Sequence, residues 1–480
     1  MITARVLALL AVLLAAGAAK AQLEADGPLE SKLGLELSNR ARYERVDWFR
    51  TAPTSAIRNY DYGFFANRLQ LGLRITRDPL ELFVQYQNSL LTSLPKNAPG
   101  PGGSYFTNTP EVNQEKGILR NAWLRWKSPL GARGVSLQAG RQLYREGLEA
   151  PATDPTLAWL QKNRIAERLV GPFDYTHVGR SFDGAQLAYD DAAVNVTGFA
   201  FVPTWGGFEI NANRELEVGI AGVSASAKAL EALPGTNARL FGLWYRDRRD
   251  LTPVDNRPLA VREADSGDLE IYTLGVNLTR VESLGPGKAD LLVWGAMQFG
   301  DWQSQSQSSW AYAAELGYQL PDVFGAPWLR VGLDQSSGDS DPGDDEHETF
   351  FQVLPTARLY ALFPFYNLMN NRDLFGQLIL RPHPILTAAA TLHWLRVSER
   401  DDFLYSGGGA TSNSVFGYSG TATGGRNGIG TLADLSLTIQ PLKPLTINVY
   451  YAHVFGCGLI EQAFAGDDAN FAFAEATISF

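Results

Sequence analysis

The sequence predicts an all-β protein: a transmembrane, antiparallel, up-and-down β-barrel. Three features of the 480-residue chain lead to this prediction. Apolar and polar residues alternate with period two in many segments. Beyond the N-terminal segment, no run of about 18 apolar residues could form a membrane-spanning helix. Short connections alternate with long ones, as in barrels with short periplasmic turns and long extracellular loops.

The N-terminal segment, 1–21, is expected to be a cleaved signal peptide. An early arginine precedes an apolar run, which ends in the small-residue sequence Ala19-Lys20-Ala21. A single-pass anchor is the alternative, but the apolar run is short for a membrane span. Residues 22–480 would then form a single barrel domain in the bacterial outer membrane.

Period-two alternation marks the strands. Leu69, Leu71 and Leu73, for example, alternate with Gln70 and Gly72. The apolar positions would face lipid in a barrel, or the core in a soluble sandwich, which is the alternative. The clearest segments cover 33–44, 69–75, 80–87, 434–440, 445–451 and 474–480.

The connections favour the barrel. Segments 77–79 and 440–444 are short, whereas 88–116 and 406–430 are long. At about 25 residues for each strand with its share of connections, the length predicts roughly 16 to 20 strands, an even number. Thr156 to Lys162, after the cap Asp154 and Pro155, is expected to be a short helix, either inside the pore or on an outward loop.

The last strand raises the question of what covers its edge. The sequence ends in FAFAEATISF, with Phe480 on the apolar parity. An unpaired strand edge in a membrane is costly, so we expect the first strand to pair with the last and close the barrel.

Enzymatic chemistry is not predicted. The five histidines form no HExxH motif, and neither a GxSxG motif nor a phosphate-binding glycine loop is present. A Ser–His pair that includes His453 is the alternative left open. The acidic run 337–346 could hold Ca²⁺ through Asp339, Asp341 and Asp344, although a solvated loop without any cofactor is preferred.

Charge is the main functional signal. The net charge is −10, which disfavours nucleic acid as a partner. Arginine on a lipid face would cost ~2–4 kcal/mol near the membrane centre, so inward arginines are favoured. Such a lumen attracts anions, unless the arginines only pair with carboxylates such as Glu36 and Glu81. The arginines on the polar parity of their strands are Arg40, Arg42, Arg68, Arg74 and Arg125.

The order of three motifs resembles the alginate export family of outer-membrane barrels. The motifs are GRQ from Gly140, RLVGPFDY from Arg168 and RSFDG from Arg180. The resemblance implies 18 strands, an arginine-lined constriction, and passage of a negatively charged uronic-acid polymer. The residues that it implies for the constriction are Arg68, Arg120, Arg141 and Arg358. Arg180 shares the parity of Gln186, so it is also expected to face the lumen.

Two of these placements need a β-bulge. Arg141 shares the apolar parity of its strand, so it reaches the lumen only if Gly140 sits in a bulge. Arg120 and Arg125 have opposite parity, so both face inward only with a bulge between them.

The expected function is passive diffusion of an anionic saccharide or organic acid through an outer-membrane channel. Nutrient uptake is the first alternative, and a hydrolase or a structural barrel is the second. The expected partners are outer-membrane lipid, lipopolysaccharide and, for export, periplasmic secretion proteins.

Overall fold

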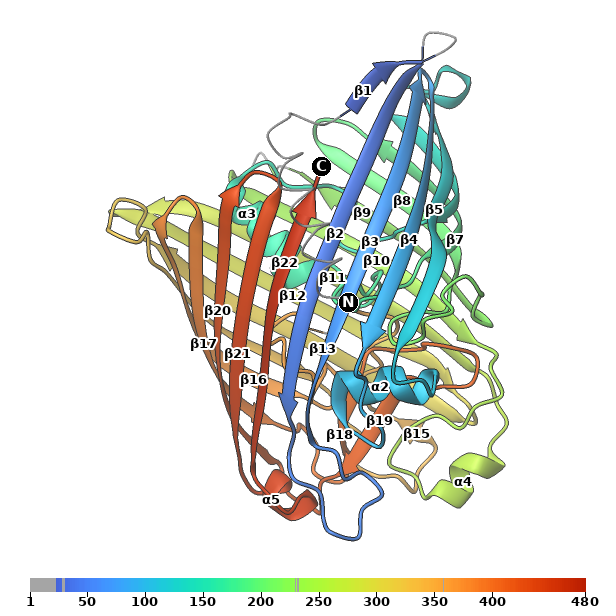
Figure 1. Ribbon diagram of the computed structural model, residues 1–480, viewed down its shortest axis with the longest axis vertical. Coiled ribbons are helices and arrows are strands. Elements are labelled where there is room, and N and C mark those ends of the chain that lie inside the picture. The colour runs from blue at the N-terminus through green and yellow to red at the C-terminus, as the bar shows by residue number, and fades with distance from the viewer. Residues whose placement is uncertain (1–22, 28–30, 229, 231–232, 357) are drawn as a thin grey trace.

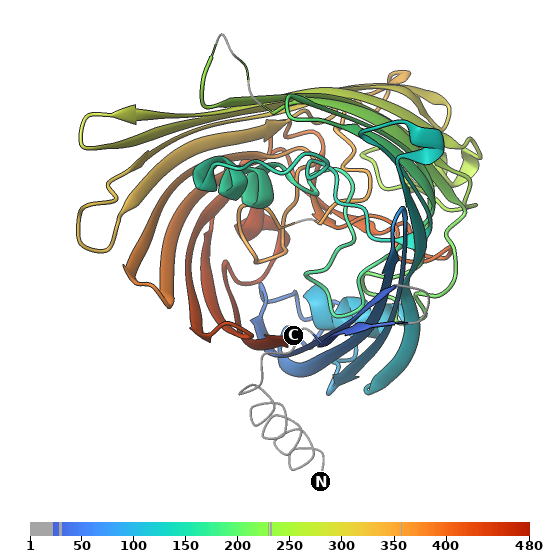
Figure 2. The same ribbon diagram turned by 90° about the horizontal axis from the view of Figure 1, so that it is seen from above.

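Strands of alternating polarity form the wall of a closed antiparallel barrel (Figures 1 and 2). The computed structural model describes residues 23–27, 31–228, 230, 233–356 and 358–480. In this part of the chain one sheet has 20 strands, of which the short β1 (Leu23–Asp26) and β15 (Glu346–His347) are accessory. The remaining 18 build the wall, as the resemblance implied. The expected signal peptide, 1–21, lies outside the described residues.

The wall strands follow one another in chain order. They are β2 (Lys32–Asp47), β3 (Asp61–Arg77), β4 (Leu80–Thr92), β5 (Gln114–Lys127), β6 (Val135–Gln142), β7 (Phe182–Asp190), β8 (Val194–Pro203), β9 (Val218–Ala227), β10 (Thr236–Asp247), β11 (Leu269–Leu284), β12 (Gly287–Trp302), β13 (Gln305–Gln319), β14 (Trp328–Ser336), β16 (Arg372–His383), β17 (Leu386–Arg396), β20 (Gly428–Leu442), β21 (Leu445–Gly456) and β22 (Asp468–Ser479).

The first and last wall strands pair with each other, as the sequence predicted. Ser38 lies opposite Ser479, and the register continues to Asp47 opposite Asn470. The backbone of Phe480 exchanges hydrogen bonds of 2.8 and 3.1 Å with that of Leu37. No edge of the wall is therefore left for water or another chain to pair.

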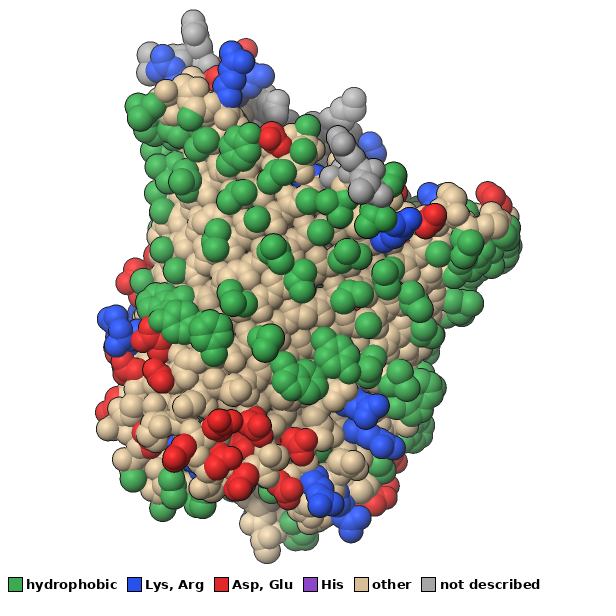
Figure 3. All heavy atoms as spheres, turned by 180° about the vertical axis from the view of Figure 1, so that it is seen from behind, with side chains coloured by type: hydrophobic (Ala, Val, Ile, Leu, Met, Phe, Trp, Pro, Cys, Tyr) green, Lys and Arg blue, Asp and Glu red, His purple; other side chains and the backbone are tan. Residues whose placement is uncertain are grey.

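The two faces of the wall differ as the period-two pattern predicts. Leu71 and Leu73 on β3 are 44% and 40% exposed on the outside, and the six segments with the clearest alternation lie in wall strands, apart from Phe480, which directly follows β22. Apolar side chains are spread over the upper and middle parts of the face in Figure 3, and acidic side chains gather toward the lower end. None of the helices in the described residues is long and apolar enough to cross a membrane.

Connections differ between the two ends of the barrel. At the turn end, where β2 begins and β22 ends, only two residues join β3 to β4 and β20 to β21. At the opposite, loop end, the connections are long, apart from the two residues between β12 and β13. They carry α2 (Gly100–Asn108), α4 (Leu259–Ala264), α5 (Leu459–Ala463) and the hairpin β18 (Phe403–Gly407) and β19 (Tyr418–Ala422). The 3₁₀ turn η2 (Pro129–Gly131) lies at the turn end.

Two long segments, 143–181 and 348–371, fold into the barrel (Figure 2). They pair with each other where Val170 bridges Leu354. The first carries the predicted helix, α3 (Pro155–Leu160), which continues as the π-helical turn η3 (Gln161–Ile165). Asp154 caps it by accepting hydrogen bonds from the next backbone amides, 2.8 and 3.1 Å away.

Of the two places considered for this helix, the structure shows the inner one. Trp159 packs against Trp328 of β14 with ring centroids 4.6 Å apart, and Thr156 accepts a hydrogen bond from Gln319 of β13. The segments 143–181 and 348–371 therefore narrow the lumen.

Because the outward face contacts lipid, the free-energy cost of a charged side chain on it should depend on the depth of that side chain in the membrane. We expect Val276→Arg, in the middle of β11, to lower the free energy of unfolding in lipid vesicles by ~2–4 kcal/mol. The control Leu284→Arg, at the turn end of the same face, should cost only ~0–1 kcal/mol. Denaturant titration measures both, and equal costs would contradict a lipid-facing surface.

Candidate functional site: an arginine cluster inside the barrel

A β-bulge in β5 turns Arg120 into the barrel. The pairing of β4 with β5 passes from Gln85–Asn121 to Tyr86–Leu119, so Arg120 is the extra residue. Arg120 is fully buried, whereas Leu119 faces outward. Arg125 keeps the inward parity of Asn121. The bulge that an inward placement of both Arg120 and Arg125 requires is therefore present.

Three wall arginines hold the inward segment 174–177. Arg40 donates to the carbonyl oxygens of Asp174 and Thr176, at 2.7 and 2.5 Å. Arg68 and Arg120 reach the Asp174 carboxylate at 3.3 and 2.6 Å. The predicted inward direction of these side chains is confirmed, but they contact protein rather than open lumen.

Asp174 is the centre of this cluster. Arg145, from the same inward segment, makes a further ion pair with its carboxylate. Burial raises the pKa of Asp174, but the guanidinium groups of Arg120, Arg145 and Arg68 outweigh burial and hold the pKa well below its usual range. Asp174 is therefore ionised at neutral pH, and it fastens segment 143–181 to the wall at β3 and β5.

The cluster continues through Tyr175. Its ring contacts two guanidinium groups, that of Arg42 at 4.3 Å and that of Arg358 at 3.9 Å from the ring centroid. Arg42 is paired with Glu475 at 2.6 Å and with Glu44 at 3.1 Å. Such cation–π contacts hold the inner segments against the wall.

Positive charge is in excess here. The guanidinium groups belong to Arg40, Arg42, Arg68, Arg120, Arg145 and Arg358, and the carboxylates to Asp174, Glu44, Glu167 and Glu475. Six cations against four anions leave a formal excess of two positive charges. Burial, together with Arg40 and Arg42, lowers the pKa of His177, so this histidine adds no charge.

Arg358 differs from the other members of the cluster. Within the described residues, no carboxylate lies within ion-pair distance of Arg358, and its Nη1 donates to the Leu362 carbonyl oxygen at 3.1 Å. Its Nε has no hydrogen-bond partner in this part of the chain. Arg358 lines a cavity at the loop end, so it is the cluster member best placed to meet a solute.

Arg74 and Arg125 pair with carboxylates, which is the alternative that the sequence left open for the inward arginines. Arg74 lies between Glu36, at 2.9 Å, and Glu81, and Arg125 lies 3.6 Å from Glu81. These pairs lie near the turn end of β2 to β5 and are partly exposed.

The expectation for Arg141 is wrong, and that for Arg180 needs correction. The β5–β6 register runs without a bulge through Gly140, so Arg141 shares the outward face of Ala122 and pairs with Asp183 at 2.5 Å. Gly140 has a φ of +119° but adds no residue. Arg180 is inside the barrel but fully buried, and it donates to the Gly408 carbonyl oxygen instead of facing a channel.

The acidic residues considered for calcium instead cap turns of their own loop. Asp339, Asp341 and Asp344 each accept a hydrogen bond from the backbone amide two residues later. In the described ranges, no three His, Cys, Asp or Glu side chains form a group that could hold a metal ion. Calcium stays a prediction.

In the described part of the chain, no histidine ring has a serine side chain as its hydrogen-bond partner. His453 lies 2.8 Å from Asn470. The hydrogen-bonding or ion-pair partners of the other four are Arg40 and Glu44 for His177, Gln307 for His347, Ile385 for His383, and Asp373 and Asp434 for His393.

Similarity to known proteins assigns this barrel to a family. The sequence model described as alginate export matches residues 30–474. The chain belongs to the alginate export family. No curated protein matches it.

Solved porins share the fold of this alginate export family member. OccAB2 of Acinetobacter baumannii superposes with a TM-score of 0.61 at 10% identity, and OccK9 (OpdG) of Pseudomonas aeruginosa with 0.58 at 12%. OpdK of P. aeruginosa, solved with vanillate, gives 0.58 at 10%. Each match covers 93% of this chain and 98% of the other. The chain is therefore an outer-membrane channel, with its turn end toward the periplasm.

Several cluster members were missed from the sequence. Asp174 lies within the RLVGPFDY motif, but its role as the shared counterion depends on contacts far apart in the chain. Arg145 carries no periodic signal, because it lies in an irregular segment. Glu475 could have been found, since its polar parity on β22 places it beside β2 in a closed barrel.

The Asp174 contacts predict an anchored inner segment. We expect Asp174→Asn to weaken that anchoring by about 3 kcal/mol, because it removes the shared carboxylate from buried ion pairs. Amide hydrogen exchange should then show roughly a hundred-fold loss of protection over 168–177. The control Glu36→Gln removes the carboxylate of another wall pair and should leave this segment protected. Unchanged protection in Asp174→Asn would refute the anchoring role.

Asp339 and Asp402, on loops at the loop end, predict a pH effect. Burial raises the pKa of Asp339 to about 7 and that of Asp402 to about 6. A raised pKa means that the loop is most stable below about pH 4 and loses stability as the pH rises through 6 and 7.

Asp339→Asn removes the charge at this position. It should therefore strengthen amide protection over 337–349 by ~2–4 kcal/mol at pH 8 and leave it unchanged at pH 4, after correction for intrinsic exchange rates. An equal effect at both pH values would contradict the raised pKa.

Proposed function

We propose that this channel passes small anionic solutes by diffusion and that its inward arginines select for negative charge. The observation that carries the proposal is the excess of guanidinium groups over carboxylates around Tyr175, including an Arg358 without a carboxylate partner. A positive excess in a narrow, low-dielectric passage attracts anions and repels cations.

The narrowing favours small solutes. Segments 143–181 and 348–371 occupy part of the lumen and are tied to its wall. A hydrated organic acid or a sugar acid needs less space than a polymer, and no covalent step is required for its passage. We therefore assign no catalytic role to the chain.

A uronic-acid polymer is the second candidate, and the family match favours it. Passage of a polymer would require segment 143–181 to move and a periplasmic partner to supply the chain. The proposal for small anions requires neither.

Ion selectivity tests the function directly. In planar bilayers under a KCl gradient, we expect the reversal potential to show that chloride permeates better than potassium. Arg358→Gln should lower the permeability ratio ~5-fold, since one charge about 4 Å from a permeating ion contributes ~1 kcal/mol in water.

Arg141→Gln is the control, because it makes the same substitution at an arginine on the outward face of the wall. It should leave the ratio unchanged. Cation selectivity in the unmodified channel, or equal effects of the two substitutions, would rule out selection by the inward arginines.

A further inference from the structure

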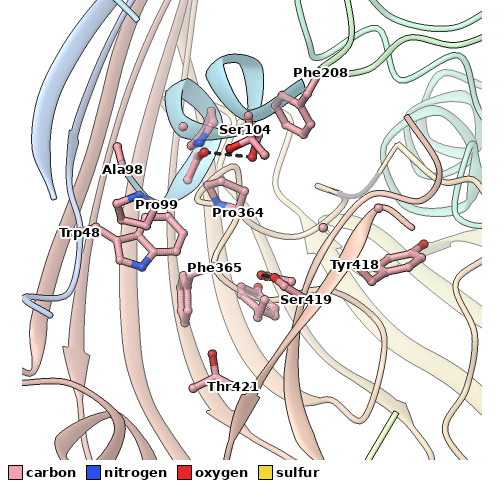
Figure 4. A pocket seen from close by; sticks show the side chains of 18 of the residues that line it. Trp48, Ala98, Pro99, Ser104, Phe208, Pro364, Phe365, Tyr418, Ser419 and Thr421 are labelled. Carbon is pink, nitrogen blue, oxygen red and sulfur yellow. Dashed lines mark hydrogen bonds between the residues drawn. The ribbon is translucent and has the colours of Figure 1, made fainter. Parts of the chain in front are cut away.

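We infer that the loop end holds a binding subsite for a small monocarboxylate whose ring has an apolar face. The inference rests on the proposed anion channel and names the class of solute that it admits. Its basis is a cavity of about 450 Å³ between the loops, shown in Figure 4. This volume suits one or two ring-sized groups rather than a folded polymer segment.

Aromatic side chains from separate connections line the cavity. Trp48 comes from the end of β2, Phe208 from the β8–β9 connection, Phe365 from segment 348–371 and Tyr418 from β19. Because they converge from distant parts of the sequence, the cavity is a product of the assembled loops.

The aromatic lining is held in place by its own packing. Trp48 contacts Phe363 edge-to-face at 5.4 Å, and Phe365 contacts Phe49 in the same way at 5.6 Å. The rings of Trp48, Phe365 and Tyr418 are at least nine-tenths buried, and Phe208 is partly buried. Ordered rings of this kind bind the flat apolar face of a solute with little loss of conformational entropy.

The charge of the cavity lining predicts which charged group the solute carries. Of the described residues that line the cavity, Arg358 is the only one with a charged side chain. A single guanidinium group without a carboxylate partner matches one carboxylate, whereas a polyanion would bring further charges into an apolar site.

Hydroxyl groups complete the lining. The Oγ atoms of Ser406 and Ser419 lie 2.9 Å apart, and Ser104 donates to the Gly100 carbonyl oxygen at 3.0 Å. Their remaining lone pairs can accept hydrogen bonds from solute hydroxyls. Both an aromatic acid and a uronic sugar have the required carboxylate and apolar face, so the two are separate arms of the test.

Arg358 also connects the cavity to the inner cluster. It borders a second, smaller cavity with Arg168, Asp334 and Tyr360, and it stacks on Tyr175. A carboxylate bound at Arg358 would thus lie next to the positive cluster around Tyr175 and Asp174.

The test measures how solutes saturate the full-length channel in planar bilayers. Benzoate, glucuronate and acetate are added at the loop end, and the concentration that gives half-maximal current block is measured for each. We expect benzoate or glucuronate to act at a concentration at least ten-fold lower than acetate. The ring carboxylate that does so identifies the solute class, and no advantage over acetate for either would overturn the inference.

Two substitutions locate the effect. Ser419→Phe fills the exposed side of the cavity, and Phe365→Leu removes a ring while keeping apolar volume, so both should reduce the ring advantage several-fold. Thr54→Phe, on an exposed loop position outside the cavity lining, is the control and should keep it. A ring advantage that survives both cavity substitutions would overturn the inference.

Failure of the subsite and failure of the channel proposal are distinguishable. If chloride permeates better than potassium but rings give no advantage, only the subsite is wrong. If chloride does not permeate better than potassium, the proposed anion channel itself is wrong.

Discussion

Backbone pairing in hydrocarbon is the constraint on which the rest of the structure depends. An unpaired amide or carbonyl costs several kcal/mol where no water can reach it, so a sheet inside a membrane must close on itself. The pairing of β2 with β22 meets this requirement, and Phe480 is bound by the backbone of Leu37. Once the wall is closed, each strand has only two faces, and the period of two assigns residues to lipid or to the interior except where a β-bulge shifts the register.

The interior is governed by charge compensation. Buried guanidinium groups are tolerated when carboxylates and carbonyl oxygens satisfy them, and Asp174 serves Arg68, Arg120 and Arg145 together. The same contacts hold the inward segment 143–181 against the wall. Anchoring and selectivity therefore draw on one set of side chains: arginines engaged with Asp174 shape the passage, and Arg358, without a carboxylate partner, is available to an anion.

A solute entering from the loop end would meet two environments in turn. The aromatic cavity discriminates by shape and apolar area, and the cluster behind it discriminates by charge. Tyr175 connects them, because its ring contacts Arg42 of the wall and Arg358 of the inner segment. Solved porins share the fold at 10% to 12% identity, which is consistent with a wall specified by alternation rather than by particular residues.

The sequence by itself determined the wall: strands such as 69–75 and 80–87, the tight turns, closure, the α3 helix and the inward direction of Arg40 and Arg68. These follow from local rules of alternation, capping and the cost of charge in lipid. Only the tertiary structure decided that α3 lies inside, that Arg141 faces outward and that Asp174 joins three arginines. Those outcomes depend on the registers of neighbouring strands and on contacts between residues more than 50 positions apart, such as Arg120 and Asp174, and no period in the sequence records such contacts.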